Sequence, residues 1–277
     1  MAEEQTTATA DLFHSDDIVA KLKLRMINHA FPLWSKEGWD RTTGGFVERL
    51  DQEGRADRLA PRRVRVQARQ IYCFAKAAQM GWYPDGREIA LKGLDHLLTR
   101  AKAPDGRPGF VHILAPDGAV LDPLRDTYDH AFILLALATA YTLDRDAQVR
   151  SEIDQLLSFL DTQLRSAHGG FVEGWPAYMP RRQNPHMHLF EAMIARLWPQ
   201  TEMAKAWIAQ AEAGEAGAAD QARAALTRLD RHYLSHPVAG GWYDQFDRDG
   251  NSLVAEIPAS SFYHVLCAAV EAEQVLG

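Results

Sequence analysis

Five short segments of the chain carry more polar and aromatic side chains than helix packing alone requires. They are residues 65–70 (RVQARQ), 126–130 (DTYDH), 181–191 (RRQNPHMHLFE), 197–202 (LWPQTE) and 258–264 (PASSFYH). Each lies at or near the end of a predicted helix. Aromatic-rich loops at helix ends are typical of carbohydrate sites, so these segments are the candidates for chemistry.

Two arginines, Arg65 and Arg69, lie four residues apart at a predicted helix start and therefore share one face of that helix. Positive charges oppose the dipole at a helix N-terminus, so we expect a partner that compensates them. A substrate oxygen and an internal carboxylate both fit that role. A structural ion pair is therefore as good an interpretation as a binding site.

Three histidines follow helix starts. His264 lies near the positive end of a helix dipole, which should lower the pKa of its imidazole and leave it a neutral base near pH 7. A packing histidine is the alternative. His188 lies three residues before Glu191, so the two share a helix face and form a usable acid–base or sugar-binding pair. For His130 we expect a hydrogen-bonded packing role.

The sequence His186-Met187-His188 suggests a metal site, but residues two apart on a helix point in different directions. We therefore expect no metal and no cofactor. Trp198 offers a flat apolar face for a sugar ring, and Glu202 can accept hydrogen bonds from hydroxyl groups. A core position is the alternative for Trp198.

A further helix start combines a tyrosine with two carboxylates. Tyr128 and Asp129 open a predicted inner helix and can face a cleft, and Asp126 is the expected N-cap.

Composition excludes several classes of protein. The 277 residues, 47% of them apolar, suffice for a sizeable core. With 30 Lys and Arg against 37 Asp and Glu, the net charge is −7, which makes nucleic-acid binding a poor fit. There is no run of about 18 apolar residues, so we expect no membrane partner. Cys73 and Cys267 form no disulfide framework, and the first 13 residues do not read as a signal peptide, so we expect a cytoplasmic protein.

Apolar residues at steps of three and four predict helices through most of the chain. Gly-Gly-aromatic triplets begin at residues 44, 169 and 240, and residues 108–110 form a weaker copy. Such a repeat predicts helix–turn–helix units that stack into an all-α fold, an α/α toroid of helical hairpins with small β-hairpins in the loops. We expect residues 1–15 to be a flexible N-terminus and residues 16–277 to be a single toroid-like domain.

In the five segments the sequence resembles the N-acylglucosamine 2-epimerase family, which includes the bacterial mannose isomerases. The resemblance extends from about Phe31 to Cys267. It implies an (α/α)6 toroid without a metal or cofactor, whose members interconvert aldoses and ketoses, or epimerise sugars at C2, through an enediolate. It also implies a small-molecule sugar as the partner.

The resemblance also assigns roles to individual side chains. It implies that His264 is one of two catalytic histidines and that His188 assists it or binds the sugar. It also places Arg69, Tyr128, Asn184, Trp198 and Glu202 at the sugar. Glu191, which shares a helix face with His188, is a further candidate for sugar binding on its spacing alone.

The chain departs from the family in its length, because family members are longer by about 100 residues. The segment Glu-Pro-Gly-His, which carries the second catalytic histidine, has no counterpart here. Six hairpins of about 62 residues would need about 370 residues, so we expect an incomplete ring. An incomplete ring would expose apolar faces, which allows for a homo-oligomer. We also expect a break at Arg196–Pro199 rather than one straight helix, because Pro199 disrupts a helix interior.

Three functions follow from these patterns. The first is an aldose–ketose isomerase that converts mannose to fructose, or their 6-phosphates, with His264 as the base and Arg69 stabilising negative oxygen. The second is an impaired homologue that binds sugars. The third, which fits least well, is a glycosidase that uses the carboxylates of Asp129 and Glu191.

Overall fold

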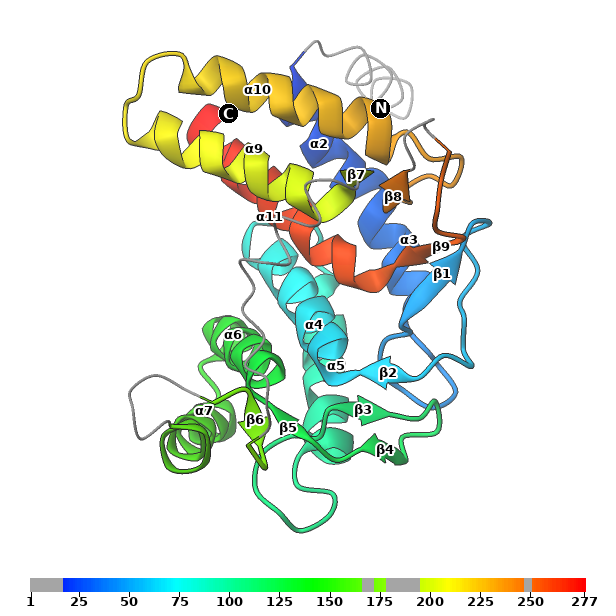
Figure 1. Cartoon of the computed structure of the whole chain (residues 1–277), viewed down its shortest axis with the longest axis vertical. Coiled ribbons are helices and arrows are strands. Elements are labelled where there is room, and N and C mark those ends of the chain that lie inside the picture. The colour runs from blue at the N-terminus through cyan, green and yellow to red at the C-terminus, as the bar shows by residue number, and fades with distance from the viewer. Residues whose placement is uncertain (1–16, 166–171, 178–194, 247–250) are drawn as a thin grey trace, which may run out of the picture.

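The computed structural model describes residues 17–165, 172–177, 195–246 and 251–277, with the backbone alone for residues 195, 196, 198 and 199. Within these ranges no helix is long and apolar enough to cross a membrane. Helices dominate, and short antiparallel strands lie in the segments that join them (Figure 1). The all-α class that the sequence predicts is confirmed.

Three of the helical segments include a short π-helical turn (η): η1 lies between α2 and α3, η2 follows α7, and η3 follows α10. The bounds of the helices and turns are α2 (Ile18–Arg25), η1 (Met26–Ala30), α3 (Phe31–Lys36), α4 (Val64–Gln79), α5 (Gly86–Ala101), α6 (Thr127–Asp144), α7 (Ala147–Phe159), η2 (Leu160–Leu164), α9 (Leu197–Glu212), α10 (Ala218–Leu229), η3 (Asp230–Leu234) and α11 (Ala259–Leu276). Aspartates cap several of them: Asp126 accepts a hydrogen bond from Asp129 N at 3.1 Å, as expected for α6.

The strands are two or three residues long and mostly join one unit to the next. They are β1 (Arg49–Asp51), β2 (Arg62–Arg63), β3 (Ile113–Leu114), β4 (Val120–Asp122), β5 (Arg125–Asp126), β6 (Gly174–Trp175), β7 (Ala195–Arg196), β8 (Gln245–Phe246) and β9 (Glu256–Pro258). The pairs β1–β9, β2–β3, β3–β4, β5–β6 and β7–β8 are all antiparallel. Among them β3–β4 is a local hairpin, and the rest link segments distant in sequence.

The repeated glycine–aromatic turns adopt the conformation that their sequence predicts. Gly44, Gly109 and Gly240 have φ values of +77°, +85° and +82°, which favour glycine. The aromatic residues Phe46, Phe110 and Trp242 that follow these turns are buried. They anchor the turns on the helix ends, and the copy at residues 169–171 lies outside the described part of the chain.

Each repeat also caps a helix of a neighbouring unit. The residue two positions after the aromatic accepts, through its backbone carbonyl, the first N–H of an inner helix, which would otherwise lack a partner. The carbonyls of Glu48, His112, Glu173 and Asp244 accept from Ala259, Val64, Thr127 and Leu197 at 3.2, 2.9, 2.9 and 2.8 Å. The first turn therefore caps the last helix, α11, and ties the two ends of the chain together.

The helices pack as an arc of four pairs. The inner helices follow the order α6, α4, α11, α9, and the outer members are α7, α5, the α2–α3 segment and α10. In Figure 1 the pairs α6–α7 and α9–α10 lie at the two ends of the arc. The described residues supply eight helical segments, whereas a complete toroid has twelve, so the arc that they form is open; for the whole chain the incomplete ring stays a prediction.

The predicted break before Pro199 is also confirmed. Residues Ala195 and Arg196 form β7, which pairs with β8, and α9 begins at Leu197. Pro199 therefore lies in the first helical turn, where its missing N–H has no intrahelical acceptor to lose.

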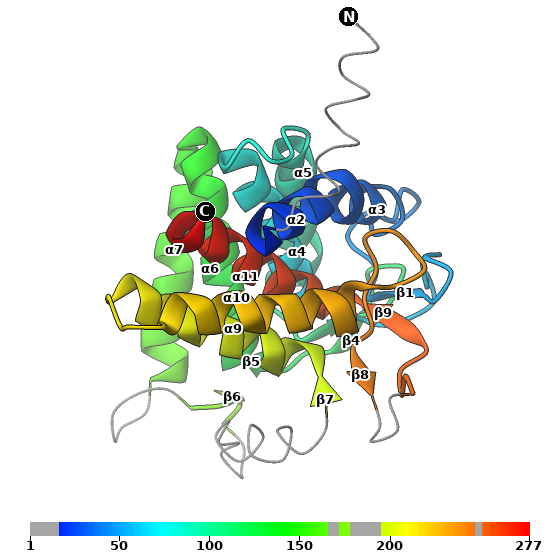
Figure 2. The ribbon, with the colours of Figure 1, turned by 90° about the horizontal axis from the view of Figure 1, so that it is seen from above.

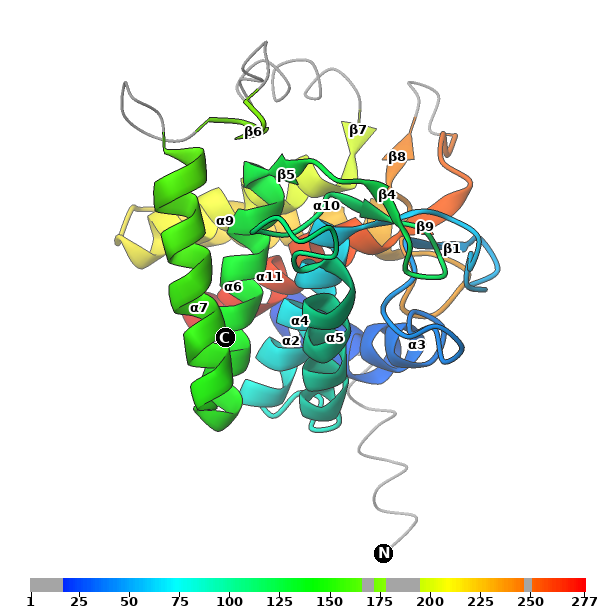
Figure 3. The same cartoon turned by 90° about the horizontal axis from the view of Figure 1, so that it is seen from below.

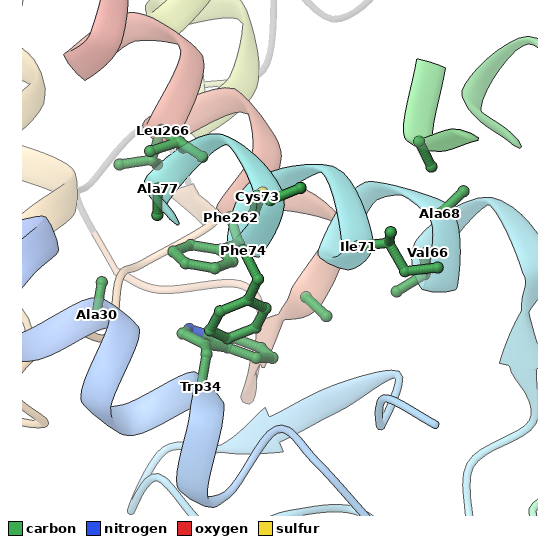
Figure 4. Close-up of a cluster of buried hydrophobic side chains, with 14 of the residues drawn as sticks. Ala30, Trp34, Val66, Ala68, Ile71, Cys73, Phe74, Ala77, Phe262 and Leu266 are labelled. Carbon is green, nitrogen blue, oxygen red and sulfur yellow. The ribbon is translucent and has the colours of Figure 1, made fainter. Parts of the chain in front are cut away.

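In the core, stacked aromatic rings join the N-terminal and C-terminal helices of the chain. Trp34 of α3 stacks on Trp242 at 5.3 Å and on Phe262 of α11 at 5.8 Å between ring centroids. Phe74 of α4 completes the cluster, as Figure 4 shows. Figures 2 and 3 show the strands gathered along one edge, beside the N-terminal ends of the inner helices. The described segments that carry candidate site residues, at the starts of α4, α6, α9 and α11, therefore meet at that edge.

Candidate active site at the start of the inner helices

His264 and Glu202 form a hydrogen-bonded pair between α11 and α9. The distance from His264 Nδ1 to Glu202 Oε1 is 3.0 Å, and Lys205 Nζ lies 2.8 Å from the other oxygen of Glu202. The His264 side chain is 16% exposed, so its imidazole lies largely within the protein. A carboxylate that fixes an imidazole in this way is a usable arrangement for proton transfer.

The surroundings of His264 keep its imidazole neutral. Burial lowers its pKa, Glu202 raises it, and the cations Arg69 and Lys205 lower it, so that the pKa lies below the ordinary value. The sequence predicts this direction from the helix dipole, but His264 lies in the second turn of α11, where that effect has faded. Burial is therefore the main cause.

Glu202 remains a carboxylate in spite of its surroundings. Burial alone would raise its pKa, but hydrogen bonds with His264 and Lys205 outweigh that effect, and the pKa is lowered. The pair is thus a neutral imidazole beside an anion at neutral pH, which suits a general base.

Arg69 of α4 is a buried cation beside this pair. Its Nη2 donates a hydrogen bond to Tyr128 Oη at 2.8 Å, and its guanidinium lies 4.1 Å from the ring centroid of Phe132 and 5.7 Å from that of Tyr263. Its Nε is buried without a hydrogen-bond partner, and no carboxylate of the described residues pairs with it. Such a group can stabilise negative charge on a substrate oxygen.

Four predicted site residues are therefore brought together by contacts between α4, α6, α9 and α11. Tyr128 touches Arg69, Arg69 lies against Tyr263, the rings of Tyr263 and His264 are 5.2 Å apart, and His264 binds Glu202. Asn184, His188, Glu191 and the side chain of Trp198 lie outside the described part of the chain, so their roles remain predictions.

Two other sequence interpretations are decided by hydrogen bonds. The sequence left two possible partners for Arg65, a substrate oxygen and an internal carboxylate. The structure shows the carboxylate, because Arg65 Nη1 lies 3.1 Å from Asp129 Oδ1. His130 is a packing histidine, as expected: its ring is fully buried, bonds to Asp126 O at 2.6 Å and accepts from Phe110 N at 3.0 Å. Asp129 is fully buried and bound by Arg65 and His112, which removes one carboxylate of the glycosidase hypothesis.

His112 is a candidate residue that the sequence analysis missed. Its Nδ1 lies 2.5 Å from Asp129 Oδ2, beside a cavity that Arg65 also lines. The repeat contained the signal, since His112 occupies the same position after its turn as Glu48, Glu173 and Asp244. All four are polar and sit beside the start of an inner helix.

The two cysteines are poor candidates for a nucleophile at this site. Cys73 and Cys267 are free thiols, and burial raises the pKa of Cys267 to about 11. Within the described ranges no three His, Cys, Asp or Glu side chains are grouped so that they could hold a metal ion.

Comparison with known proteins identifies the family of this chain. A family model described as N-acylglucosamine 2-epimerase (GlcNAc 2-epimerase) matches residues 44–197 and 195–268. The chain belongs to this family. Its members are sugar isomerases and epimerases, so an isomerase-type protein with a sugar partner is the general class. The match divides at residues 195–197, where the break before α9 lies.

A curated relative shows how the length of this chain compares with that of a similar protein. A mannose-6-phosphate isomerase of Rhizobium meliloti (strain 1021) is 29% identical over 373 aligned positions, which cover 89% of this chain and 94% of the relative. The covered part of this chain holds only about 250 residues, so more than about 100 positions of the relative have no counterpart here. This agrees with the missing segment that the sequence predicts.

Solved structures support the fold alone, because their sequences are distant. A D-mannose isomerase superposes with a TM-score of 0.66 at 15% identity, covering 92% of this chain and 97% of that chain. The cellobiose 2-epimerase of Spirochaeta thermophila DSM 6192 superposes with a TM-score of 0.55 at 20% identity, covering 92% of this chain but 63% of that chain.

Proposed function

We propose that this protein is an aldose–ketose isomerase that converts mannose to fructose, or their 6-phosphates, through an enediolate. The observation that carries the proposal is the hydrogen-bonded His264–Glu202 pair beside Arg69, a buried cation without a carboxylate partner among the described residues. Enolisation needs a base at the carbon next to the carbonyl and a donor for the oxygen that becomes negative.

In this proposal His264 takes the proton from C2 of the open-chain aldose. The C–H electron pair forms the C1–C2 double bond of the enediolate, and Arg69 stabilises the charge that develops on O1. Return of a proton to C1, with loss of the hydroxyl proton from O2 and its gain at O1, gives the ketose. His188, if it lies at this site, relays the oxygen proton.

A second candidate is an impaired homologue that binds sugars without turning them over. The more than about 100 positions of the mannose-6-phosphate isomerase that have no counterpart here, and the arc of four helix pairs, favour it. Both candidates require the same sugar-binding face, so turnover decides between them.

The test is incubation with mannose, and separately with mannose 6-phosphate, in deuterated water, followed by NMR of the product. We expect a ketose with solvent deuterium at C1, and a loss of at least about 100-fold in kcat for His264→Ala, the low end for a general base. Sugar binding without any ketose would favour the impaired homologue. Full turnover by His264→Ala would remove His264 from the mechanism.

A further inference from the structure

Aromatic rings enclose the guanidinium of Arg69 on several sides. Its Cζ lies 4.1 Å from the ring centroid of Phe132, 5.6 Å from that of Tyr128 and 5.7 Å from that of Tyr263. Arg69 is 6% exposed, and no carboxylate of the described residues pairs with it. Buried charges in proteins are usually paired with an opposite charge. The rings therefore take a place that a carboxylate commonly fills.

Three helices build this enclosure, and its rings support one another. Helix α4 packs against both α6 and α11, so Phe132 of α6 and Tyr263 of α11 meet beside Arg69 of α4. The two rings lie edge to face, with centroids 5.3 Å apart and planes at 88°. Phe132 makes a second edge-to-face contact with Tyr128, one turn away on α6, at 5.1 Å and 86°. Because such contacts are favourable, the rings are fixed by one another as well as by the cation.

The enclosure holds the cation without adding a negative charge. An aromatic face attracts a guanidinium through its quadrupole but carries no formal charge. The hydrogen bond that Arg69 Nη2 donates at 2.8 Å ends on a hydroxyl group, Tyr128 Oη. A carboxylate in the same place would hold Arg69 firmly but would also cancel its charge. Burial lowers the pKa of Arg69, yet an arginine side chain keeps its proton in proteins, so the positive charge stays available to a ligand.

We propose that Phe132 and Tyr263 are positioning residues that hold Arg69 toward an anionic oxygen of the ligand and leave its charge unneutralised. Phe132, the nearest ring, is the main contributor. The inference rests on the proposed function for the identity of that oxygen, O1 of the enediolate, where a preoriented charge in a buried site contributes most. The site should therefore distinguish an anion from its uncharged analogue, and this distinction should depend on Phe132.

The first experiment measures this distinction without turnover. D-arabinonate carries a carboxylate that resembles the enediolate, D-arabinitol is its uncharged analogue, and neither can isomerise. Titrations followed by NMR of the ligands give the ratio of the two dissociation constants, in which contacts of the shared hydroxyl groups largely cancel. We expect Arg69→Gln to lower the preference for arabinonate at least about tenfold. An unchanged ratio would show that the charge of Arg69 does not reach the ligand and would overturn the proposal.

The second experiment removes the nearest ring. Phe132→Leu should lower the preference for arabinonate about three- to fivefold, whereas Phe132→Tyr, which keeps the aromatic face, should stay within about twofold of the wild type. Tyr141→Leu is the matched control, because Tyr141 is also half-buried on α6 but has its ring 5.5 Å from the guanidinium of Arg145. Equal effects of Phe132→Leu and Tyr141→Leu would mean that these rings only stabilise the fold, which contradicts the proposal.

Turnover separates a positioning role from substrate binding. If Arg69 acts on charge that develops only in the transition state, its displacement should lower kcat and leave KM for mannose within about twofold. We expect Phe132→Leu to lower kcat about three- to fivefold, Phe132→Tyr to restore it, and Tyr141→Leu to leave it within about twofold. A rise in KM at unchanged kcat would assign the ring to substrate binding and contradict a positioning role.

Failure of this inference and failure of the proposed function give different results. If no ketose forms but Phe132→Leu still lowers the preference for arabinonate, the positioning proposal stands and the isomerase proposal falls. If the wild-type chain converts mannose to fructose while Phe132→Leu and Tyr141→Leu bind and react alike, the isomerase proposal stands and the positioning proposal falls.

Discussion

The His264 imidazole should set the acidic limb of the pH profile. Only its neutral form can accept a proton, and burial lowers its pKa, so kcat/KM should stay high at pH 7 and fall as the pH drops through a pKa below the ordinary value of histidine. Among the described residues, the charged groups that act on it are Glu202 and Lys205 of α9 and Arg69 of α4. Glu202→Gln should move the limb to lower pH, because the carboxylate favours the protonated imidazole.

The matched variant is Lys205→Gln, which removes a cation that lowers the same pKa and should move the limb to higher pH. Profiles of kcat/KM against pH, with mannose as the substrate, measure both shifts. Two shifts of the same sign would show that His264 does not produce this limb.

Sequence patterns identify part of the site at the level of residues. Arg69, Tyr128, Glu202 and His264 lie in short motifs with definite spacing, and they are in contact in the structure. His112 escaped notice because its importance depends on Asp129, 17 residues away, and on a cavity that no local pattern reveals.

At the level of elements, the glycine turns should tolerate substitution unequally. Gly109 has φ +85°, and a Cβ there would lie 2.5 Å from the ring of Phe159, whereas Gly106 in the same loop has φ +76° with nothing within 4 Å. Gly109→Ala combines backbone strain with displacement of a buried ring and should lower the free energy of unfolding by about 2–4 kcal/mol. Gly106→Ala should cost about 1 kcal/mol.

Urea unfolding of the two variants measures the difference, and equal losses would mean that contact with Phe159 is unimportant.

The repeat itself was visible in the sequence, as was the need for glycine. Its capping of neighbouring helices was not, because each carbonyl and the N–H it binds belong to segments 46 residues or more apart, as for Thr127 and Glu173.

At the level of the whole molecule, chain length predicts the number of helical units but not the order in which they pack. A count of repeats predicts an incomplete ring, and the break before Pro199 identifies where the missing part belongs. The order of packing, with α6 and α9 at the two ends of the arc and α11 joined to α4, depends on contacts between distant segments. Those contacts are set by side chains such as Trp34 and Phe262, which local patterns mark only as apolar.

An arc, unlike a closed ring, should open more easily at its ends than in its middle. Helix α4 packs against α5, α6 and α11, and α11 packs against α4, α9 and α2, so both lie between neighbours. Helix α7 packs mainly on α6, at one end of the arc. Local opening is easier where fewer buried contacts are lost, so amides of residues 147–159 should exchange with solvent sooner than those of residues 64–79 and 259–276. Hydrogen–deuterium exchange with mass spectrometry, corrected for intrinsic rates, measures this order. Equal protection of α7 and α4 would mean that something other than the described helices supports the end of the arc.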